Sequence, residues 1–266
     1  MSLNLSMYQK IFNIKKKKIV ITGADGLIGS KIFNIFKKLG ADVYPMDINL
    51  SDPSIFELKN KDKKNVKFVA DVSNLSHIKK IYNYFYQNKI SIDVLINAHQ
   101  IKPKGFLSNK PENFDEDLWK QIIEVNLTGT FLTCKYFGRM MIKKKKGSII
   151  NIGSTYGIVS SNESLYKGLK FGNPIAYSAS KGGVSSLTKY LASHWGKYNI
   201  RVNCLIPHGV ENNQSIIFKK RFSNQSPLNR MMKVDEIIGP AIFLSSDASS
   251  YCTGSNFLVE GGWTAW

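Results

Sequence analysis

Residues Lys18 to Ser30 read KIVITGADGLIGS, a β-branched run that ends in glycine and leads into a helical pattern. The glycines Gly23, Gly26 and Gly29 fall in the turn between the two. Glycine permits a tight turn and lets backbone N–H groups approach a pyrophosphate, and the helix N-terminus adds partial positive charge there. A glycine turn between a strand and a helix predicts a dinucleotide-binding βαβ unit.

Strand-like and helix-like segments alternate from this turn to the end of the chain. The strands lack two-residue alternation, as expected when both faces of a sheet are buried. We therefore expect an α/β fold, a single doubly wound domain whose seven-stranded parallel sheet is flanked by helices on both faces. The expected strands are residues 18–23, 41–47, 66–71, 92–97, 147–154, 200–207 and 256–262, and the expected helices are 26–40, 77–88, 113–143 and 177–197.

No shift in composition marks a second domain. We expect residues 1–16 to form an N-terminal extension and residues 17–266 to form the single folded domain, with an inserted loop at about 155–176. One residue is awkward in this scheme: Pro45 lies within the expected second strand, where proline cannot donate a ladder hydrogen bond.

Asp47 stands at the end of the expected second strand. A carboxylate at that place can accept hydrogen bonds from both adenosine ribose hydroxyls, and it repels a 2′-phosphate. This predicts NAD as the cofactor in preference to NADP. A structural alternative is that Asp47 caps the following turn.

The chain carries 37 Lys and Arg against 19 Asp and Glu, a net charge of +18, so nucleic-acid binding has to be weighed. Arginine occurs only at Arg139, Arg201, Arg221 and Arg230, and the lysines accompany many Asn and Ile residues. Compositional bias explains this pattern, and we expect no nucleic-acid partner. A positive field can still attract an anionic substrate.

The remaining composition favours a cytoplasmic protein with no membrane contact. No apolar run approaches the roughly 20 residues of a membrane-spanning helix, and the N-terminus lacks an apolar stretch of signal-peptide length. The three cysteines are far apart and odd in number, which favours free thiols. The four histidines show no metal-ligand spacing, so we expect no metal.

Tyr177 and Lys181 share a helix face in NPIAYSASKGG, a spacing that alone says little about chemistry. The chain also carries EVNLTGTF around Asn126 and NIGSTYG around Ser154. With these motifs in this order, the chain resembles the short-chain dehydrogenase/reductase family from about Lys17 to Gly262. Within that family it is similar to oxidoreductases of bacterial surface-sugar and flagellin-glycosylation gene clusters.

The resemblance implies a Rossmann fold and four catalytic residues. Tyr177 would be the general acid/base, and Lys181 would favour its phenolate and bind the nicotinamide ribose. Ser154 would hydrogen-bond the substrate oxygen. Asn126 would hold a water that connects Lys181 to solvent. Structural alternatives remain for Ser154 as a strand-end hydroxyl and for Asn126 as a helix-distorting residue.

The glycine turn and the resemblance together give a set of expected cofactor residues, which also includes Tyr177 and Lys181. The turn supplies those around the pyrophosphate, and the resemblance supplies those around the adenine and the nicotinamide. They are Gly23, Asp25, Gly26, Leu27, Ile28, Gly29, Asp47, Ile48, Asp71, Val72, Asn97, Ala98, Val125, Pro207, His208 and Val210.

The sequence departs from the family in three places. NAHQ stands at Asn97 to Gln100 and PHG at Pro207 to Gly209, where members commonly have smaller residues, so His99 either reaches the substrate or only fills space. The third departure is the glycine spacing, which is that of a longer branch of the family.

The inserted loop is also unusually long and should border the substrate pocket. The expected substrate residues are His99, Tyr156, Tyr166, Lys167, Lys170 and Phe171.

Three functions remain open. The leading hypothesis is an NAD-dependent oxidoreductase of carbohydrate biosynthesis that interconverts a secondary alcohol and a ketone. Its small-molecule substrate would be sugar-like or a sugar phosphate, and anionic. The second is a 3-oxoacyl-thioester reductase, whose acidic carrier protein would suit the positive charge. The third is a non-catalytic dinucleotide sensor or nucleic-acid-binding regulator on the same fold. Family habit also implies a homodimer or homotetramer.

Overall fold

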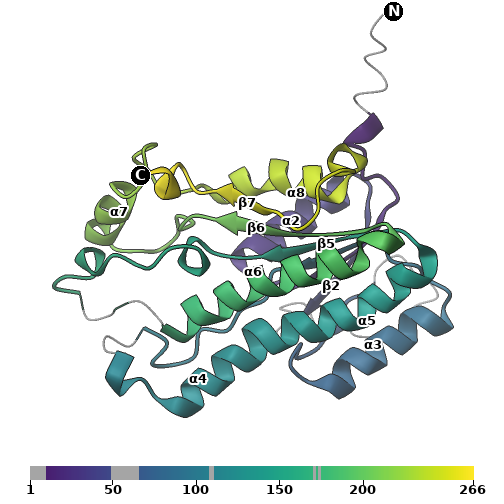
Figure 1. Ribbon diagram of the computed structural model, residues 1–266, viewed down its shortest axis with the longest axis horizontal. Coiled ribbons are helices and arrows are strands. Elements are labelled where there is room, and N and C mark those ends of the chain that lie inside the picture. Colours follow the sequence, from purple (N-terminus) through teal and green to yellow (C-terminus); the bar gives the residue numbers. More distant parts are fainter. Residues whose placement is uncertain (1–9, 49–65, 108–110, 170–171, 173–174) are drawn as a thin grey trace, which may run out of the picture.

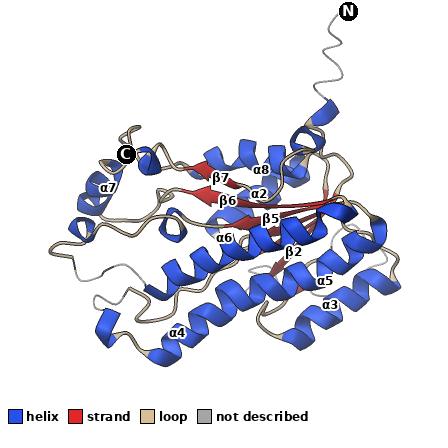
Figure 2. Ribbon diagram, in the orientation of Figure 1, coloured by secondary structure: helices blue, strands red, loops and turns tan. Residues whose placement is uncertain are grey.

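The computed structural model describes residues 10–48, 66–107, 111–169, 172 and 175–266. Its centre is one sheet of seven parallel strands in the order β3-β2-β1-β4-β5-β6-β7 (Figures 1 and 2). The order reverses between β1 and β4, as in doubly wound folds, which confirms the predicted architecture. The strands are β1 Lys18–Thr22, β2 Asp42–Asp47, β3 Phe68–Val69, β4 Val94–Asn97, β5 Gly147–Ile152, β6 Ile200–Pro207 and β7 Asn256–Val259.

Helices cover both faces of this sheet (Figure 1). Helices α2 and α8 lie on one face, and α3, α5 and α6 lie on the other, with α4 leading into α5. Helix α7 lies beyond the carboxyl ends of the strands, near the C-terminus. The bounds are α2 Leu27–Lys38, α3 Leu75–Gln87, α4 Glu116–Ile123, α5 Gly129–Lys144, α6 Ile175–Trp195, α7 Ile216–Ser223 and α8 Ile238–Ser245.

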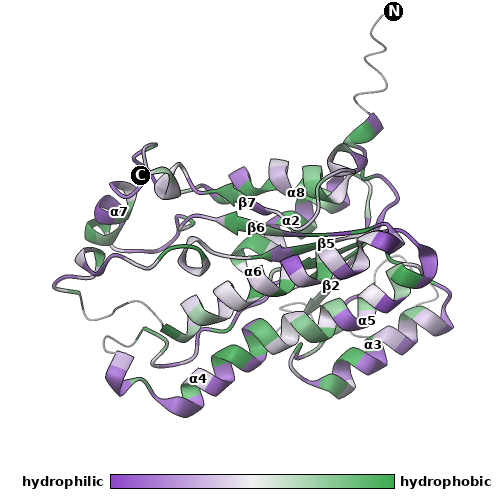
Figure 3. Ribbon diagram, in the orientation of Figure 1, coloured by the Kyte–Doolittle hydropathy of each residue, from purple (hydrophilic) through white to green (hydrophobic). Residues whose placement is uncertain are grey.

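Each face of the sheet has its own hydrophobic core. Along β1, Ile19 and Ile21 point to the face covered by α2 and α8, and Val20 points to the face covered by α3, α5 and α6. All three are fully buried. Figure 3 accordingly shows hydrophobic residues along the strands and polar residues on the loops and outward turns. Burial on both faces explains why the strands lack clean alternation.

Pro45 fits within β2 because the described part of β3 does not extend far enough to pair with it. The backbone oxygen of Asp47 accepts a bond from Ala70, so Asp47 and, two residues earlier, Pro45 face β3. The described strand β3 pairs only with Met46 and Asp47. The missing N–H of Pro45 therefore lies where the described ladder needs no donor.

Three boundaries differ from expectation. The third strand is only Phe68–Val69. Helix α3 begins at Leu75, because the side chain of Asn74 caps it by accepting the N–H groups of Ser76 and His77. The buried side chain of Ile14 packs in the core under α2, so the packed domain begins before residue 17.

A π-helical turn, Glu124–Thr128, joins α4 to α5 where the sequence indicated one long helix. Such turns insert an extra residue into a helix and are frequent at functional sites. Here the insertion turns Asn126 to the interior, where it is fully buried.

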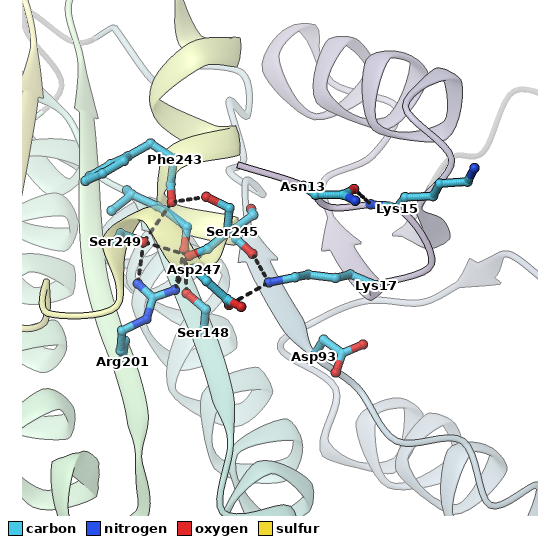
Figure 4. A network of polar contacts seen from close by, with 12 residues as sticks. Asn13, Lys15, Lys17, Asp93, Ser148, Arg201, Phe243, Ser245, Asp247 and Ser249 are labelled. Atoms are coloured by element: carbon cyan, nitrogen blue, oxygen red, sulfur yellow. Dashed lines mark hydrogen bonds and ion pairs between the residues drawn. The ribbon is translucent and has the colours of Figure 1, made fainter. Parts of the chain in front are cut away.

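A polar network closes the end of the sheet opposite the carboxyl ends of the strands (Figure 4). Arg201 of β6 donates to the backbone oxygens of Leu244 and Ser246 at 2.9 and 3.1 Å, and Lys17 donates to that of Ser245 at 3.1 Å. These are the last carbonyls of α8, which have no partner within the helix. Lys17 also forms an ion pair with Asp247. The network is structural and fixes α8 to β1 and β6.

Candidate active site

A cavity of about 930 Å³ opens at the carboxyl ends of the strands. Its walls come from the ends of β1, β2, β4, β5 and β6, from the first turn of α2, and from α6 and α7. Open parallel sheets bind ligands at this edge, next to the position where the strand order reverses. The cavity is therefore the candidate site.

The glycine turn gives one part of this cavity the form that a pyrophosphate requires. Gly23 has a φ of +66°, and a Cβ there would lie 2.6 Å from the backbone of His99. Gly26 caps α2 without a side chain, and the first-turn residues Leu27 and Ile28 line the cavity. Backbone N–H groups at an uncapped helix start are suited to bind an anion. The turn thus fits a dinucleotide.

Asp47 lies where the sequence predicted it, at the end of β2 and on the cavity wall. One of its carboxylate oxygens accepts the backbone N–H of Asp25 at 2.9 Å. This bond holds the carboxylate beside the glycine turn. Asp71 and Val72 line the same part of the cavity, as do Ile48, Ala98 and Val125.

Tyr177, Ser154 and Lys181 converge on the cavity from two elements. Ser154 follows β5, whereas Tyr177 and Lys181 lie one turn apart on α6. The Nζ of Lys181 is 5.7 Å from the centre of the Tyr177 ring and donates to the backbone oxygen of Ile152 at 2.8 Å. Phe106 packs edge-on against Tyr177 at 5.8 Å. The structure thus brings together three of the four predicted catalytic residues.

Burial shifts the proton affinities of this group. It raises the pKa of Tyr177, and a hydrogen bond with Ser154 partly offsets the rise. Burial also lowers the pKa of Lys181 to about 8. Ser154 is therefore a neighbour that lowers the pKa of Tyr177. The ammonium of Lys181 lies close enough to the Tyr177 ring to stabilise a negative charge on its oxygen.

Asn126 lies behind the cavity wall and is not one of its lining residues. Its side-chain oxygen accepts the N–H of Ile101 at 3.0 Å, and its amide donates to the hydroxyl of Ser180 at 3.2 Å. Ser180 in turn donates to the backbone oxygen of Tyr177. In the structure Asn126 is a positioning residue, which connects the turn that carries Tyr177 to the segment after β4.

Two expected cofactor residues also lie behind the wall. Gly29 is buried under the turn, where a Cβ would contact the backbone of Gly23. Asn97 accepts hydrogen bonds from Thr22 and Thr133 and donates to Asn151 at 2.9 Å. These contacts hold β1, β4 and β5 together, so Gly29 and Asn97 shape the site without facing the cavity.

His99 lines the cavity but has its ring nitrogens engaged. The hydroxyl of Thr22 is 2.6 Å from Nδ1, and that of Thr130 is 3.2 Å from Nε2. Burial, as the largest influence, lowers the pKa of His99 to about 3. The residue is therefore a neutral, satisfied histidine, which favours the space-filling interpretation over a contact with substrate.

The first half of the inserted loop contributes aromatic side chains to the cavity. Tyr156 and Tyr166 line the cavity, and their hydroxyl oxygens are 2.8 Å apart. His208, from the end of β6, lines it as well and is 4 % exposed. Its ring centre is 4.6 Å from that of Phe222 and 4.8 Å from that of Trp263.

Lys167 is not brought to the cavity. Its side chain is exposed. Its backbone oxygen accepts a hydrogen bond from Nη1 of Arg221 at 2.5 Å. The short helical turn Glu163–Leu165 directs Leu165 and Tyr166 inward, which leaves the next residue outside. Lys170 and Phe171 lie outside the described residues.

Several wall residues were not predicted from the sequence. Phe218 and Phe222 belong to α7, which carries no recognised motif. Lys102 follows the NAHQ segment, and its position there was the one signal that could have identified it. The others are Ala70, Ser73, Gln100, Ile101, Gln121, Glu124, Ile152, Gly153, Gly209, Asn212, Gln214 and Met231.

Among the described residues, no group of three or more His, Cys, Asp or Glu side chains is placed to hold a metal ion. In the same part of the chain, no helix combines the length and apolar character needed to cross a membrane.

Comparison with known proteins agrees with this geometry. Residues 23–264 match the family model described as enoyl-(acyl carrier protein) reductase. The chain is 30% identical over 265 residues to an NAD-dependent glycerol dehydrogenase of Listeria innocua, covering 97% of each chain. It is 34% identical over 257 residues to a 3-oxoacyl-(acyl-carrier-protein) reductase of Thermotoga maritima, covering 94% of this chain and 98% of that protein.

A solved structure extends the comparison. The crystal structure of a short-chain dehydrogenase from Leptospira borgpetersenii with bound NAD+ superimposes with a TM-score of 0.84. The two share 32% sequence identity, over 99% of this chain and 97% of that one. The similarity therefore extends over the whole fold.

Proposed function

The chain belongs to the short-chain dehydrogenase/reductase family, and from this premise we propose that it interconverts a secondary alcohol and a ketone with NAD, using Tyr177 as general acid/base. Membership makes it an oxidoreductase that acts on CH–OH groups with a nicotinamide dinucleotide. The observation that carries the finer proposal is the meeting of Tyr177, Ser154 and Lys181 at the cavity.

The proposed chemistry follows from these three side chains. The bound dinucleotide supplies or accepts the hydride at its nicotinamide ring. Ser154 donates a hydrogen bond to the substrate oxygen and orients it, and Tyr177 gives a proton to that oxygen in reduction or removes one in oxidation. A neutral phenol suits the reductive direction, because its raised pKa keeps the proton in place at pH 7. The ammonium of Lys181 stabilises the phenolate left after proton transfer.

Asp47 supports NAD as the cofactor. Its carboxylate is held beside the glycine turn at the end of β2, where an adenosine ribose would lie in this fold. A carboxylate there accepts bonds from two ribose hydroxyls and repels a 2′-phosphate.

The substrate we propose is of the sugar-alcohol type. The glycerol dehydrogenase relative acts, by its name, on a small polyol. The cavity wall offers hydroxyl groups from Tyr156 and Tyr166 to such a substrate. An anionic group on the substrate stays a prediction, for which the exposed Lys102 on the cavity wall is a better partner than Lys167.

Reduction of a 3-oxoacyl thioester is the second candidate. It is favoured by the description of the matching family model and by the relative from Thermotoga maritima. The net charge of +18 would also suit an acidic carrier protein. The non-catalytic regulator is disfavoured, because the chain belongs to a family of oxidoreductases.

Initial rates on a small substrate set separate the two candidates. The purified protein is assayed with NAD+ and glycerol or galactitol, and with NADH and acetoacetyl-coenzyme A. We expect activity on at least one polyol and a much lower kcat/KM for the thioester. A kcat/KM that is higher for the thioester would favour the second candidate, and inactivity on all three in a protein that binds NADH would contradict the first.

A further inference from the structure

Five residues that line the cavity carry rings that contact one another. We name this part of the cavity the aromatic chamber and define it by Tyr156, Tyr166, His208, Phe218 and Phe222. These side chains come from the inserted loop, the end of β6 and α7, three segments that are far apart in the sequence. No motif predicted their meeting.

Ring-on-ring contacts hold the tyrosine and phenylalanine rings of the aromatic chamber in place. Phe218 packs on Phe222 at 5.2 Å and on Tyr166 at 6.0 Å. Outside the chamber, Trp263 packs edge-on against Tyr156 at 5.9 Å and against Phe222 at 5.0 Å. Aromatic pairs at such separations are stabilising beyond the burial of their surface. The rings of Tyr156 and Tyr166 are therefore held in place by Trp263 and Phe218.

Two polar groups of the aromatic chamber have unused hydrogen-bonding capacity. The Tyr156 hydroxyl makes one described hydrogen bond, to Tyr166, although a hydroxyl can take part in up to three. The Nε2 atom of His208 is buried and has no hydrogen-bond partner among the described residues. A buried polar atom without a partner lowers the stability of a fold, so such atoms need an explanation.

Both groups are neutral near pH 7. Burial raises the pKa of Tyr156 well above its ordinary value and lowers that of His208 to about 4. Neutral hydroxyl and imidazole groups hydrogen-bond hydroxyls well. The chamber thus presents hydrogen-bonding positions among apolar ring faces, a combination that fits the C–H and O–H groups of a polyol.

Tyr156 is also tied directly to the reacting group. Its backbone N–H donates to the Ser154 hydroxyl at 3.2 Å, and Ser154 hydrogen-bonds Tyr177. Any substrate oxygen held by Ser154 and Tyr177 therefore lies at a defined place relative to the Tyr156 side chain.

We propose that Tyr156 and His208 bind additional hydroxyl groups of the substrate, so that the enzyme selects a polyhydroxylated ketone or alcohol over one with a plain hydrocarbon chain. This inference rests on the proposed alcohol–ketone activity and adds the residues that select the substrate. For His208 the proposal requires the ring to turn when the substrate binds, because its Nε2 atom is buried in the structure.

The test compares two four-carbon ketones, erythrulose and butan-2-one, with NADH as reductant. Erythrulose carries hydroxyls on its other carbons, and butan-2-one carries none. We expect the wild-type kcat/KM to be higher for erythrulose by about tenfold or more, since one or two hydrogen bonds of about 0.5–1.5 kcal/mol each separate the two substrates.

Variants assign this preference to the chamber. Tyr156→Phe keeps the ring packed on Trp263 and should lower the ratio of the two kcat/KM values about five- to tenfold, and His208→Phe should lower it as well. Tyr166→Phe also removes the hydrogen bond between Tyr156 and Tyr166 but keeps the Tyr156 hydroxyl. The ratio of the kcat/KM values for erythrulose and butan-2-one should therefore change less in this variant. Tyr190→Phe, which removes a hydroxyl on the exposed face of α6, is the outside control.

The outcomes separate this inference from the proposed function. Reduction of butan-2-one without preference for erythrulose would overturn the inference and leave the proposed function in place. An equal loss in Tyr156→Phe and Tyr166→Phe would also overturn it, because anchoring of the loop would then explain the effect. Reduction of neither ketone, by a protein that binds NADH, would overturn both.

Discussion

The two parts of the cavity are built in different ways. On the cofactor side, the walls are the ends of β1, β2 and β4 and the turn into α2, so backbone geometry defines the site. On the substrate side, the aromatic chamber is assembled from side chains of separate segments. A dinucleotide is recognised largely through backbone N–H groups and one carboxylate, whereas selection among alcohols needs particular side chains. The cofactor side therefore has a sequence motif, and the substrate side has none.

Two buried histidines illustrate the contrast. His99, on the cofactor side, has hydroxyl partners at both ring nitrogens, from Thr22 and Thr130. His208, in the aromatic chamber, has an Nε2 atom with no partner among the described residues. Satisfied buried polar groups stabilise a fold, and unsatisfied ones reduce its stability. The first histidine is part of the architecture, and the second is kept at a cost to stability that ligand binding can offset.

The largest expected effect is at the place where the two sides meet. Tyr177→Phe keeps the ring that packs on Phe106 and removes the hydroxyl. We expect kcat to fall by about two to four orders of magnitude, the usual contribution of a general acid/base, while the Kd for NAD stays near the wild-type value. Steady-state rates and calorimetric titration measure the two. Turnover close to wild type would exclude Tyr177 from proton transfer.

The next effect should be confined to the cofactor side. Asp47→Ala removes the carboxylate, and we expect the preference for NAD over NADP to narrow by about 10- to 100-fold, as for loss of hydrogen bonds to a charged group worth about 1.5–3 kcal/mol. Direct titration with both dinucleotides measures the ratio. The erythrulose preference should be unchanged, and a wild-type protein that binds NADP more tightly would contradict the assignment of Asp47.

The pH profile of ketone reduction tests Lys181. Its pKa of about 8 lies below the raised pKa of Tyr177, so Lys181 loses its proton first as the pH rises. We expect kcat for reduction, with NADH saturating, to fall above about pH 8 and to approach tenfold per pH unit, because the charge that stabilises the phenolate is lost.

Lys181→Arg is the matched control for this profile. Arginine stays charged over the whole range, so the variant should lack the fall near pH 8, whatever its overall rate. A wild-type profile that stays flat above about pH 8 would contradict the role given to the lysine charge.

The smallest effect compares the two histidines through stability. His208→Phe removes a buried polar atom without a partner, so we expect the Tm to stay unchanged or rise by a few degrees, at about 2–4 °C per kcal/mol for a chain of this size. His99→Phe should lower the Tm, because it leaves the Thr22 and Thr130 hydroxyls without the ring. Thermal unfolding of both variants measures the difference, and a lower Tm for His208→Phe than for His99→Phe would contradict the contrast.

Lowering the pH should reduce the stability of the wild type more than that of His208→Phe. The pKa of folded His208, about 4, is below the value of about 6.5 in an unfolded chain, so the unfolded state binds more protons between these values. The wild type should therefore lose stability as the pH falls from about 6.5 toward about 4, and His208→Phe should lose less over the same range. Equal slopes in the two proteins would show that His208 is not held neutral by the fold.

The sequence predicted most of the fold because the strands and the glycine turn are local features. The alternation of strand-like and helix-like segments predicted the sheet. The turn at Gly23 and the carboxylate of Asp47 predicted where a dinucleotide would bind. Tyr177 and Lys181 were identified through the family resemblance of several motifs, and the structure places the two residues one turn apart on α6.

The missed features depend on contacts between segments or on small local rotations. Tyr166 faces the cavity and Lys167 faces solvent because a single short turn sets their directions, and residue type alone could not distinguish them. Phe218 and Phe222 look like an ordinary helix face until α7 is placed over the carboxyl ends of the strands. The contacts of Asn126 with Ser180 and Ile101 depend on the π-helical turn, which no sequence pattern indicated.

The π-helical turn Glu124–Thr128 also sets the phase between α4 and α5. Deleting one residue there would restore an uninterrupted α-helix, but it would rotate every residue on one side of the turn by about 100° relative to those on the other. Asn126 lies in the turn and contacts Ser180, whereas Thr130 lies in α5 and contacts His99. After a deletion between them, the two side chains could no longer make both contacts. The junction therefore tolerates substitutions far better than changes of length, and a one-residue insertion or deletion at that junction is expected to disrupt the α6 turn that carries Tyr177.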